Sequence, residues 1–272
     1  MADEKKQFVV FATPSKDGKV VLGYLTSFGR TIRLLNEHDI GWDHASIGND
    51  PYLTKCRNGF VLPILQAMPQ MTDLFFLDDD IEWDAKGVLK LLQDPRPIVS
   101  GIYPKKSDTV DFPVELSFEG GEEVDGVMKG GDLVERDGWY KARKVPTGFL
   151  RIKREVLEAM VAGLPRYKDP TLGNMIVSNV FQGGFSGDKV EKTGLGEWWG
   201  EDYLFCEMAA QMGYEIWVWP DINFGHTGPK TWTGNLLQRI KGGAEHGEFR
   251  VVKMSSNAEP ETFKHQRAKE AA

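Results

Sequence analysis

Cysteine is scarce in this chain, and long apolar runs are missing. Cys56 and Cys206 are its two cysteines among 272 residues, and they lie far apart without the spacing of a zinc site. The sequence therefore indicates neither a disulfide framework nor a zinc centre, and it fits a reducing cytosol. No apolar run approaches the roughly 18 residues of a membrane-spanning helix, and the polar segment 1–6 lacks the apolar centre of a signal peptide. We expect a soluble, cytoplasmic protein with no membrane partner.

An excess of basic residues is missing too. Lys and Arg number 33 against 40 Asp and Glu, a formal net charge of -7. This charge argues against a broadly basic surface that coats nucleic acid, although a local basic groove remains compatible with it. The sequence also has no Gly-rich phosphate loop of the Walker type, which counts against the use of nucleoside triphosphates.

What the chain does have is an acidic cluster at the end of an apolar run. The run 74–77 is typical of a strand buried on both faces, and Asp78, Asp79 and Asp80 follow it at once. Three adjacent carboxylates repel one another and are costly to desolvate unless a cation or hydrogen-bond donors meet them. Since side chains alternate along an extended chain, Asp78 and Asp80 can face one side. Hard oxygen ligands at this spacing suit Mg²⁺ or Mn²⁺.

An acidic turn that caps the following helix is the alternative explanation of this cluster. Asp84 stands directly before the apolar-periodic segment 85–92 and is the predicted N-cap of that helix. Capping needs one carboxylate, not three more after a buried strand. We therefore predict a cap at Asp84 and a metal site at Asp78 and Asp80.

The first third of the chain alternates between strand and helix patterns. Strands are predicted at 8–14, 44–48 and 74–77, with helices at 20–36 and 52–68 between them. This order predicts an α/β fold with a doubly wound sheet and helices on both of its faces. Ligands bind beyond the carboxyl ends of the strands in such sheets, where the acidic cluster lies.

Three later segments offer further groups to a ligand. A strand and loop over 97–106 present Tyr103 and two lysines, of which we expect Lys105 to reach phosphates. The Thr147-Gly148 pair, before a helix at 155–162, can offer a hydroxyl and backbone donors, although a plain turn has the same composition.

The remaining organisation follows from turn residues and charge. Alternating residues over 112–144 predict antiparallel hairpins inserted in the sheet. The Gly-rich segment 183–200 is predicted to be a mobile loop that ends in Trp198 and Trp199. A polar, basic-leaning tail over 230–272 is expected to follow a single domain over 1–229.

The order of these motifs resembles that of the GT-A glycosyltransferases. Asp78-x-Asp80 is similar to their DxD motif. Glu201-Asp202 is similar to their acidic pair at a helix start, and His226 is similar to their late metal-binding histidine. A narrower resemblance is to the TET-associated glycosyltransferases, which are found largely in phage genomes. It is carried by the runs Leu-Asp-x-Asp-Ile, Gly-x-Tyr-Pro-x-Lys, Thr-Gly-Phe, Glu-Asp-Tyr and Gly-His. Asp79 departs from the broad pattern, which has a small residue at this position.

The resemblance implies a GT-A fold, with a mixed, mainly parallel sheet, and a set of roles for the matching residues. Mn²⁺ or Mg²⁺ is expected on Asp78, Asp80 and His226, and Asp202 with Glu201 is expected to supply the base of an inverting transfer. The donor is expected to be a nucleotide sugar, most simply a UDP-sugar. Its expected contacts are Thr13, Pro14, Arg57, Asn58, Asp79, Tyr103, Lys105, Thr147, Gly148 and Trp199.

The narrower family is linked to glycosylation of 5-hydroxymethylpyrimidines in DNA, which makes such DNA the expected acceptor and places a phage-encoded enzyme in the host cytoplasm. Basic residues at 141–144 and 151–154 are expected to contact DNA phosphates, as are those of the tail: Lys230, Arg239, Lys241, Arg250 and Lys253. Three alternatives stay open: a saccharide acceptor, a sugar-nucleotidyltransferase or phosphohydrolase using two metals, and a nucleotide-sugar-binding module without catalysis. For the last, Trp217 and Trp219 would be stacking platforms, yet their alternation on a strand is more simply explained by a core position.

Overall fold

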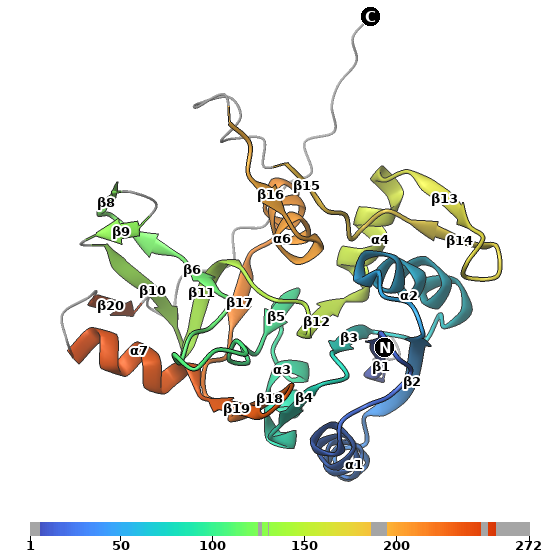
Figure 1. The fold of residues 1–272 in the computed structure, drawn as a ribbon, viewed down its shortest axis with the longest axis horizontal. Coiled ribbons are helices and arrows are strands. Elements are labelled where there is room, and N and C mark those ends of the chain that lie inside the picture. Colours follow the sequence, from blue (N-terminus) through green and yellow to red (C-terminus); the bar gives the residue numbers. More distant parts are fainter. Residues whose placement is uncertain (1–5, 125–126, 130, 186–194, 246–249, 254–272) are drawn as a thin grey trace, which may run out of the picture.

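The computed structural model describes residues 6–124, 127–129, 131–185, 195–245 and 250–253. Figure 1 shows a large central sheet with helices packed against it and short paired strands at its margins. In order across the sheet, the main strands are β2 (Gly41–Gly48), β1 (Phe8–Ser15), β3 (Asp73–Leu77), β12 (Phe149–Lys153), β5 (Ile98–Ser100), β17 (Ile216–Val218), β11 (Trp139–Lys144), β10 (Asp132–Arg136) and β20 (Arg250–Lys253).

The strand directions bring several chain segments to one edge of the sheet. β2, β1, β3, β5 and β17 all run the same way, while β12 runs antiparallel between β3 and β5. The carboxyl ends of these five strands therefore meet the amino end of β12. This edge receives the segments that follow β1, β3 and β5 and the one that precedes β12.

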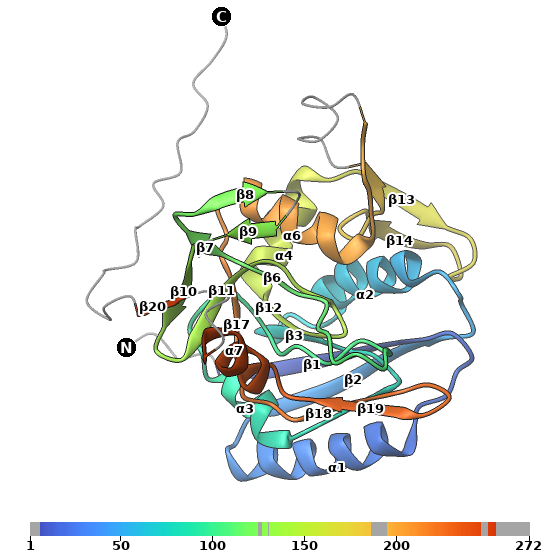
Figure 2. The same ribbon diagram turned by 60° about the vertical axis from the view of Figure 1, so that its left-hand side comes forward.

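Helices cover both faces of the sheet. Figure 2 shows α1 (Leu22–Glu37) and α3 (Ala85–Leu92) on one face and α2 (Leu53–Ala67), α4 (Arg154–Gly163) and α6 (Glu201–Gln211) on the other. Alternate residues of one strand serve the two cores: Val10 packs on the side of α2, whereas Val9 and Phe11 pack on the side of α1. All five residues of β3 are buried, as expected for a strand covered twice. The predicted α/β class with helices on both faces is confirmed.

Element boundaries differ from the sequence predictions at a few points. β2 begins at Gly41 instead of residue 44, because its first residues pair with β1 from Phe8 onward. α1 begins at Leu22, after Val21 donates its backbone N–H to the Asp79 carbonyl at 3.0 Å. The predicted cap of α3 is confirmed, since Asp84 Oδ1 accepts a hydrogen bond from the Lys86 N–H at 3.0 Å.

Hairpins occupy the predicted insertion and extend the central sheet. β10 and β11 pair antiparallel across a turn in which Asp137 and Gly138 both have positive φ, the geometry that a two-residue hairpin turn requires. β6 (Glu115–Leu116) adds to β11, and β7 (Phe118–Glu119) adds to β10. β8 (Glu122–Val124) pairs with β9 (Val127–Lys129). Because β11 pairs with β17, strands β6, β7, β10 and β11 belong to the same sheet as the first strands, whereas β8 and β9 form a separate two-stranded sheet.

A separate three-stranded sheet begins directly after the acidic cluster. It consists of β4 (Ile81–Trp83), β18 (Phe224–Thr227) and β19 (Thr231–Gly234), with β18 in the middle. The antiparallel register places His226 opposite Ile81. His226 is therefore brought next to Asp80, although 146 positions separate them in the sequence.

The last part of the chain is more structured than a polar tail. The range 230–253 contains β19, α7 (Leu236–Glu245) and β20, and Leu236 and Ile240 are buried. β20 pairs in parallel with β10 and so joins the central sheet. The remainder, 254–272, lies outside the described residues. None of the described helices is long and apolar enough to cross a bilayer.

Two short hairpins lie near α2 and α6. β13 (Arg166–Asp169) pairs with β14 (Met175–Ser178), which packs against α2. β15 (Gly184–Phe185) pairs with β16 (Trp198–Trp199), so the ends of the predicted mobile loop 183–200 are joined as paired strands. The centre of that loop, 186–194, lies outside the described residues.

Candidate active site

Arg57 is the centre of a cluster of ionised groups at the carboxyl edge of the sheet. It comes from α2 and is only 3% exposed. Its Nη2 lies 3.3 Å from Asp78 Oδ1, after β3, and its Nε lies 3.2 Å from Glu201 Oε1, in the first turn of α6. Its Nη1 is buried and has no hydrogen-bond partner among the described residues. One donor of this guanidinium thus remains available to a ligand.

Asp78 is held from two further directions. Its Oδ2 accepts a hydrogen bond from the Tyr103 hydroxyl at 3.2 Å, and its backbone N–H donates to the Gly148 carbonyl at 2.9 Å. Burial, and then the Asp78 charge, raise the pKa of Tyr103 well above its ordinary value, so the phenol keeps its proton and donates. A Cβ on Gly148 would lie 2.2 Å from Asp78 Oδ2 and 2.4 Å from the Tyr103 hydroxyl. Only glycine leaves room for this pair.

Thr147 lies at the same edge, directly before Gly148. Its side chain is buried, and its hydroxyl has no partner in the described part of the chain. Two buried donors, this hydroxyl and Arg57 Nη1, are therefore unsatisfied in the same region. Buried polar groups normally find partners, and a ligand with oxygen acceptors would supply them here.

Asp202 is the group best suited to exchange protons near neutral pH. Burial, and then the charge of Glu201, raise its pKa to about 6. The backbone N–H of Tyr203 donates to its Oδ1 at 2.8 Å, and the positive end of the α6 dipole favours its charge. A carboxyl that titrates just below neutrality can accept a proton from an attacking hydroxyl at pH 7.

A second cluster surrounds Asp80. His226 Nε2 lies 3.4 Å from Asp80 Oδ1, and Lys106 Nζ lies 2.5 Å from Asp80 Oδ2. Burial opposes ionisation of Asp80, yet the hydrogen bonds from His226 and Lys106 hold its pKa below its ordinary value. His226 Nδ1 lies 2.8 Å from the Pro104 carbonyl, which can only accept, so this nitrogen carries a proton. The hydrogen bond to Asp80 uses the other ring nitrogen, Nε2, which then also carries a proton.

This donor set fits a divalent cation in part. A carboxylate oxygen and an imidazole nitrogen face each other, and a cation bound between them would take the place of the Nε2 proton. Imidazole and carboxylate together suit Mn²⁺. The structure does not assemble the expected ligand set Asp78, Asp80 and His226, because Arg57 and Tyr103 engage Asp78. In keeping with this, the described ranges contain no group of three or more His, Cys, Asp or Glu side chains placed to hold a metal ion. Of the three predicted ligands, the structure brings Asp80 and His226 together, and the metal site stays a prediction.

The end of β1 forms a third group of polar contacts. Thr13 Oγ1 lies 2.6 Å from the Tyr24 hydroxyl and 3.1 Å from His44 Nε2. Burial raises the pKa of Asp79, which a hydrogen bond to Ser15 partly offsets. Pro14, which lies between Thr13 and Ser15 in β1, is also buried. Tyr24, His44 and Ser15 carry no motif in the sequence, and no signal there indicates them.

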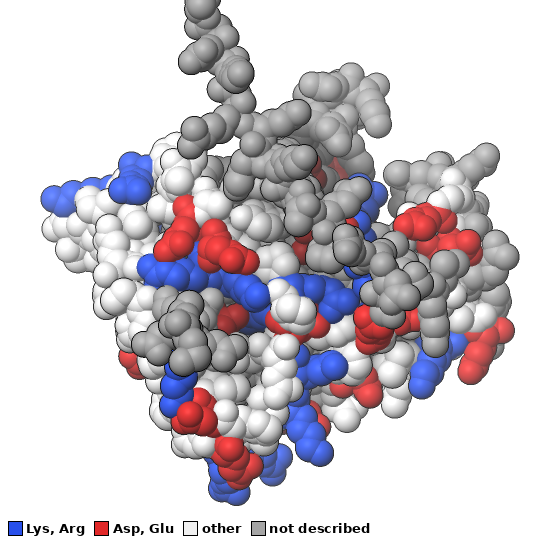
Figure 3. Space-filling model, turned by 180° about the vertical axis from the view of Figure 1, so that it is seen from behind, with Lys and Arg blue, Asp and Glu red and all other residues white. Residues whose placement is uncertain are grey.

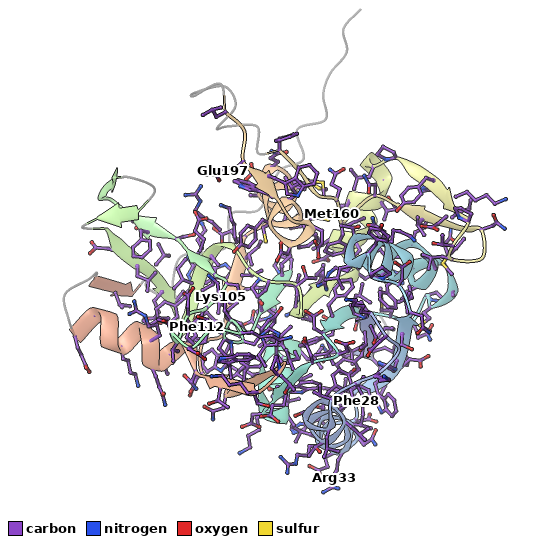
Figure 4. All side chains as sticks on the ribbon, viewed as in Figure 1. Phe28, Arg33, Lys105, Phe112, Met160 and Glu197 are labelled. Atoms are coloured by element: carbon purple, nitrogen blue, oxygen red, sulfur yellow. The ribbon has the colours of Figure 1, made fainter. Side chains whose placement is uncertain are left out.

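Two residues expected at the donor site have other partners. The Lys105 Nζ pairs with Asp111 Oδ2 at 2.6 Å, and its neighbour Lys106 reaches Asp80 instead. Figure 4 shows Lys105 close to Phe112, the residue after its partner. The Asn58 amide donates to the Phe181 carbonyl at 2.8 Å and accepts from the Phe181 N–H at 2.7 Å. Asn58 thus joins α2 to a neighbouring segment and is removed from the candidate site.

The tryptophans divide into core and surface positions. Trp217 is buried and Trp219 is half-buried, consistent with the core position predicted for this pair. Trp199 is half-buried, and Lys144 Nζ lies 4.1 Å from its ring centroid. No donor contact can be read from this position alone, but Trp199 is three residues before Asp202 in the sequence.

The basic segment 151–154 does not form a phosphate-binding surface as expected. Arg151 is fully buried and donates to the backbone carbonyls of Leu91, Asp94 and Arg96, at 2.8, 2.6 and 2.5 Å for the shortest contacts. It stabilises the end of α3 and the following turn. The face in Figure 3 carries basic and acidic side chains side by side, not a uniform basic field. The basic cluster at 141–144 and the basic residues of the range 230–253 remain candidates.

A wide groove elsewhere in the molecule does not coincide with these clusters. A groove of about 940 Å³ lies between α1 and the β4–β18–β19 sheet and is lined by Glu82, Asn223 and Asn235 among others. Arg57, Asp78 and Asp202 do not line it. Paired charges, a perturbed carboxyl and unsatisfied buried donors favour the Arg57–Asp202 region as the reactive site.

Comparisons with known proteins add little beyond this geometry. No family model matches the sequence, and no curated protein matches it. Among solved structures, the chain is similar to the crystal structure of A197 from STIV, with 18% sequence identity, a TM-score of 0.44, and coverage of 82% of this chain and 86% of that chain. A likeness of this degree carries no inference about function.

Proposed function

We propose that this protein is a metal-dependent, inverting glycosyltransferase with a GT-A fold that uses a nucleotide-sugar donor. The observation that carries the proposal is the position of Asp202. Its carboxyl has a pKa of about 6 and lies in the same cluster as Arg57, whose guanidinium holds Asp78 and Glu201. A proton acceptor and a set of donors for an anionic leaving group are thus combined at one edge of the sheet.

The leaving-group side of the proposed reaction involves Asp80, His226, Lys106 and Arg57. Asp80 and His226 would hold Mn²⁺ or Mg²⁺, and the cation supplies positive charge to the diphosphate as the glycosidic bond breaks. Lys106 adds a second cation beside Asp80, and Arg57 Nη1 offers a free donor. These groups stabilise negative charge that develops only as the donor is cleaved, which is where catalysis gains most.

The acceptor side of the reaction belongs to Asp202. The acceptor oxygen forms a bond to the anomeric carbon while the bond from that carbon to the diphosphate oxygen breaks, and its electron pair leaves with the phosphate. The acceptor's proton passes to the Asp202 carboxylate. Attack opposite the leaving group inverts the anomeric configuration.

Hydroxymethylated bases in DNA are the acceptor that we propose. The sequence resemblance to the TET-associated family supports this choice, and so does one feature of the surface. Arg143 and Lys144 share a single carboxylate, Glu115, at 3.1 and 2.6 Å. One positive charge therefore remains uncompensated within this trio, and phosphodiesters are suitable partners for it.

Mass spectrometry of reaction products tests the proposal. The purified protein is incubated with Mn²⁺, a panel of nucleotide sugars, and either DNA that contains 5-hydroxymethylcytosine or plain saccharides. A base heavier by one sugar is the expected product. Transfer to saccharides alone would reject the DNA acceptor, and absence of transfer from every donor would reject the glycosyltransferase.

Two-metal phosphoryl transfer is less well supported by the geometry. It requires carboxylates that share a pair of ions, whereas Asp78 is engaged by Arg57 and Tyr103 and Asp80 by His226 and Lys106.

A further inference from the structure

A short arm of paired strands adjoins the helix that carries Asp202. In β15 and β16, Phe185 pairs with Trp198 and Gly184 pairs with Trp199. Figure 1 shows both strands beside α6. β16 continues through Gly200 into the first turn of α6, so Trp198 lies four residues before Asp202 in the sequence. The arm is therefore covalently close to the proposed base.

Two large aromatic rings of this arm face solvent. Phe185 and Trp198 are each 67% exposed. Their ring centroids are 5.4 Å apart and their planes are at 90°, an edge-to-face contact that leaves ring faces free. Gly183 lies against the Trp198 ring, since a Cβ there would come within 3.1 Å of it. Exposed aromatic surface of this kind is typical of a binding site for an apolar or planar group.

Positive charge lies at the base of the arm, beside Trp199 and Tyr203. Lys144 Nζ is 4.1 Å from the centroid of Trp199 and 5.4 Å from that of Tyr203. Because Lys144 and Arg143 share Glu115, this surface has a cation to spare for a phosphate. Aromatic rings interleaved with such cations are the usual platform for unpaired nucleic-acid strands.

One acidic side chain opposes that charge. Glu197 accepts a hydrogen bond from Trp199 Nε1 at 3.2 Å, and Figure 4 shows it at the end of α6 nearest the arm. Its carboxylate would repel a phosphodiester. Removal of the Glu197 charge should therefore strengthen the binding of a phosphodiester, which can be measured.

We propose that Phe185 and Trp198 stack against an unpaired base of the nucleic-acid acceptor and thereby hold it next to Asp202. This inference rests on the proposed function and narrows its substrate to a base that is single-stranded or extruded from a duplex. A base inside a duplex shows only its edges, so its faces become available to Phe185 and Trp198 only after it leaves the stack.

Fluorescence anisotropy with short labelled DNA tests the stacking. The probes are a single strand that contains one 5-hydroxymethylcytosine and the same strand fully paired, and maltoheptaose serves as a competitor. We expect the single strand to bind more tightly than the duplex, and Phe185→Ala or Trp198→Ala to weaken it about 5- to 150-fold, as loss of one stacked base does. Trp42→Ala on β2, another exposed tryptophan, should leave affinity unchanged. Glu197→Gln should strengthen binding at low salt.

Several outcomes would overturn the inference. They are wild-type affinity of both arm variants with correct circular-dichroism spectra, tighter binding of the duplex, and displacement of the strand by maltoheptaose. Metal-dependent binding of UDP, measured in parallel, separates this failure from that of the proposed function. If wild type and arm variants bind UDP and bind DNA equally well, only the stacking inference fails. If wild type binds UDP but no DNA, the proposed DNA acceptor fails as well, and the nucleotide-sugar site stands. If wild type binds no nucleotide with or without Mn²⁺, the proposed function fails first.

Discussion

Arg57 and Glu201 lie 144 positions apart in the sequence, yet Arg57 Nε is 3.2 Å from Glu201 Oε1. The same guanidinium reaches Asp78 at 3.3 Å, so one buried cation ties α2 to the end of β3 and to the start of α6. Burial disfavours the charge of Arg57, but the carboxylates of Asp78 and Glu201 outweigh burial and raise its pKa. The cluster around Arg57 is thereby held together by electrostatics as well as by the sheet.

Removal of this cation should destabilise the fold and not only the site. Arg57→Met leaves two partly buried carboxylates without their partner, which typically costs about 3–5 kcal/mol of unfolding free energy. Urea unfolding followed by circular dichroism measures this loss. Arg33→Met, on the exposed face of α1 (Figure 4), is the matched control and should change stability by less than about 0.5 kcal/mol. Similar midpoints for the two variants would contradict the clamp.

Local pattern was enough to predict the elements that carry the site. The uninterrupted apolar run before Asp78 predicts a strand that is buried on both faces, which is β3. Asp84 directly precedes an apolar-periodic segment and so predicts the cap of α3. Both predictions depend on the chemistry of a few neighbouring residues. The Thr147-Gly148 pair is predicted either to offer donors to a ligand or to form a plain turn, and the structure shows a steric requirement for glycine at residue 148.

Side-chain partners from distant segments could not be predicted in the same way. Lys105 and Lys106 are adjacent and chemically identical, and the choice between them depends on a loop in which the Lys105 N–H donates to the Asp111 carbonyl. The sequence places Arg151 among cations expected to contact phosphates, because its neighbours in the chain do not show that it binds backbone carbonyls. Those carbonyls belong to the end of α3, which is distant in the sequence. The same holds for Asn58, whose partner Phe181 is 123 positions away.

Gly148→Ala should damage the Asp78–Tyr103 pair selectively. The added methyl group would overlap both side chains, and overpacking of this kind typically costs about 1–3 kcal/mol. Gly29→Ala is the control, because a Cβ at that position of α1 meets no atom within 4 Å and should stabilise the helix by up to about 1 kcal/mol. Thermal unfolding of the two variants checks both signs. A Gly148→Ala protein as stable as wild type would show that the pair can move aside.

Asp80→Ala should abolish metal-dependent nucleotide binding. The substitution removes the carboxylate that faces His226 Nε2, and imidazole alone holds Mn²⁺ weakly. Isothermal titration of UDP with and without Mn²⁺ measures the effect. Asp84→Ala, four residues later, should lose about 1 kcal/mol of stability with its helix cap and keep wild-type nucleotide affinity. Equal, metal-independent binding in wild type and Asp80→Ala would reject the cation site.

Asp202→Asn should lower turnover about 10²- to 10⁴-fold while nucleotide affinity stays unchanged, because a general base acts on the acceptor in the transition state. In wild type, the rate should fall as pH drops through about 6, where Asp202 gains a proton. Glu207→Gln, on the same helix, keeps the wild-type pH profile as the control. If the Asp202→Asn variant is active and has the same pH profile as wild type, Asp202 is not the base and has only a structural role at the start of α6.

The raised pKa of Asp202 also predicts how stability depends on pH. The folded protein keeps the proton up to a pH of about 6, whereas the unfolded chain loses it near the ordinary value of about 4. Between these values the folded state binds more protons than the unfolded state, so the contribution of Asp202 to stability falls as pH rises through this window. Asn carries no titratable proton, and the Asp202→Asn protein should therefore lack this decline and gain stability relative to wild type at pH 7. Urea unfolding at a series of pH values measures the difference between the two proteins, and a difference that does not change with pH would show that Asp202 titrates alike in the folded and unfolded states.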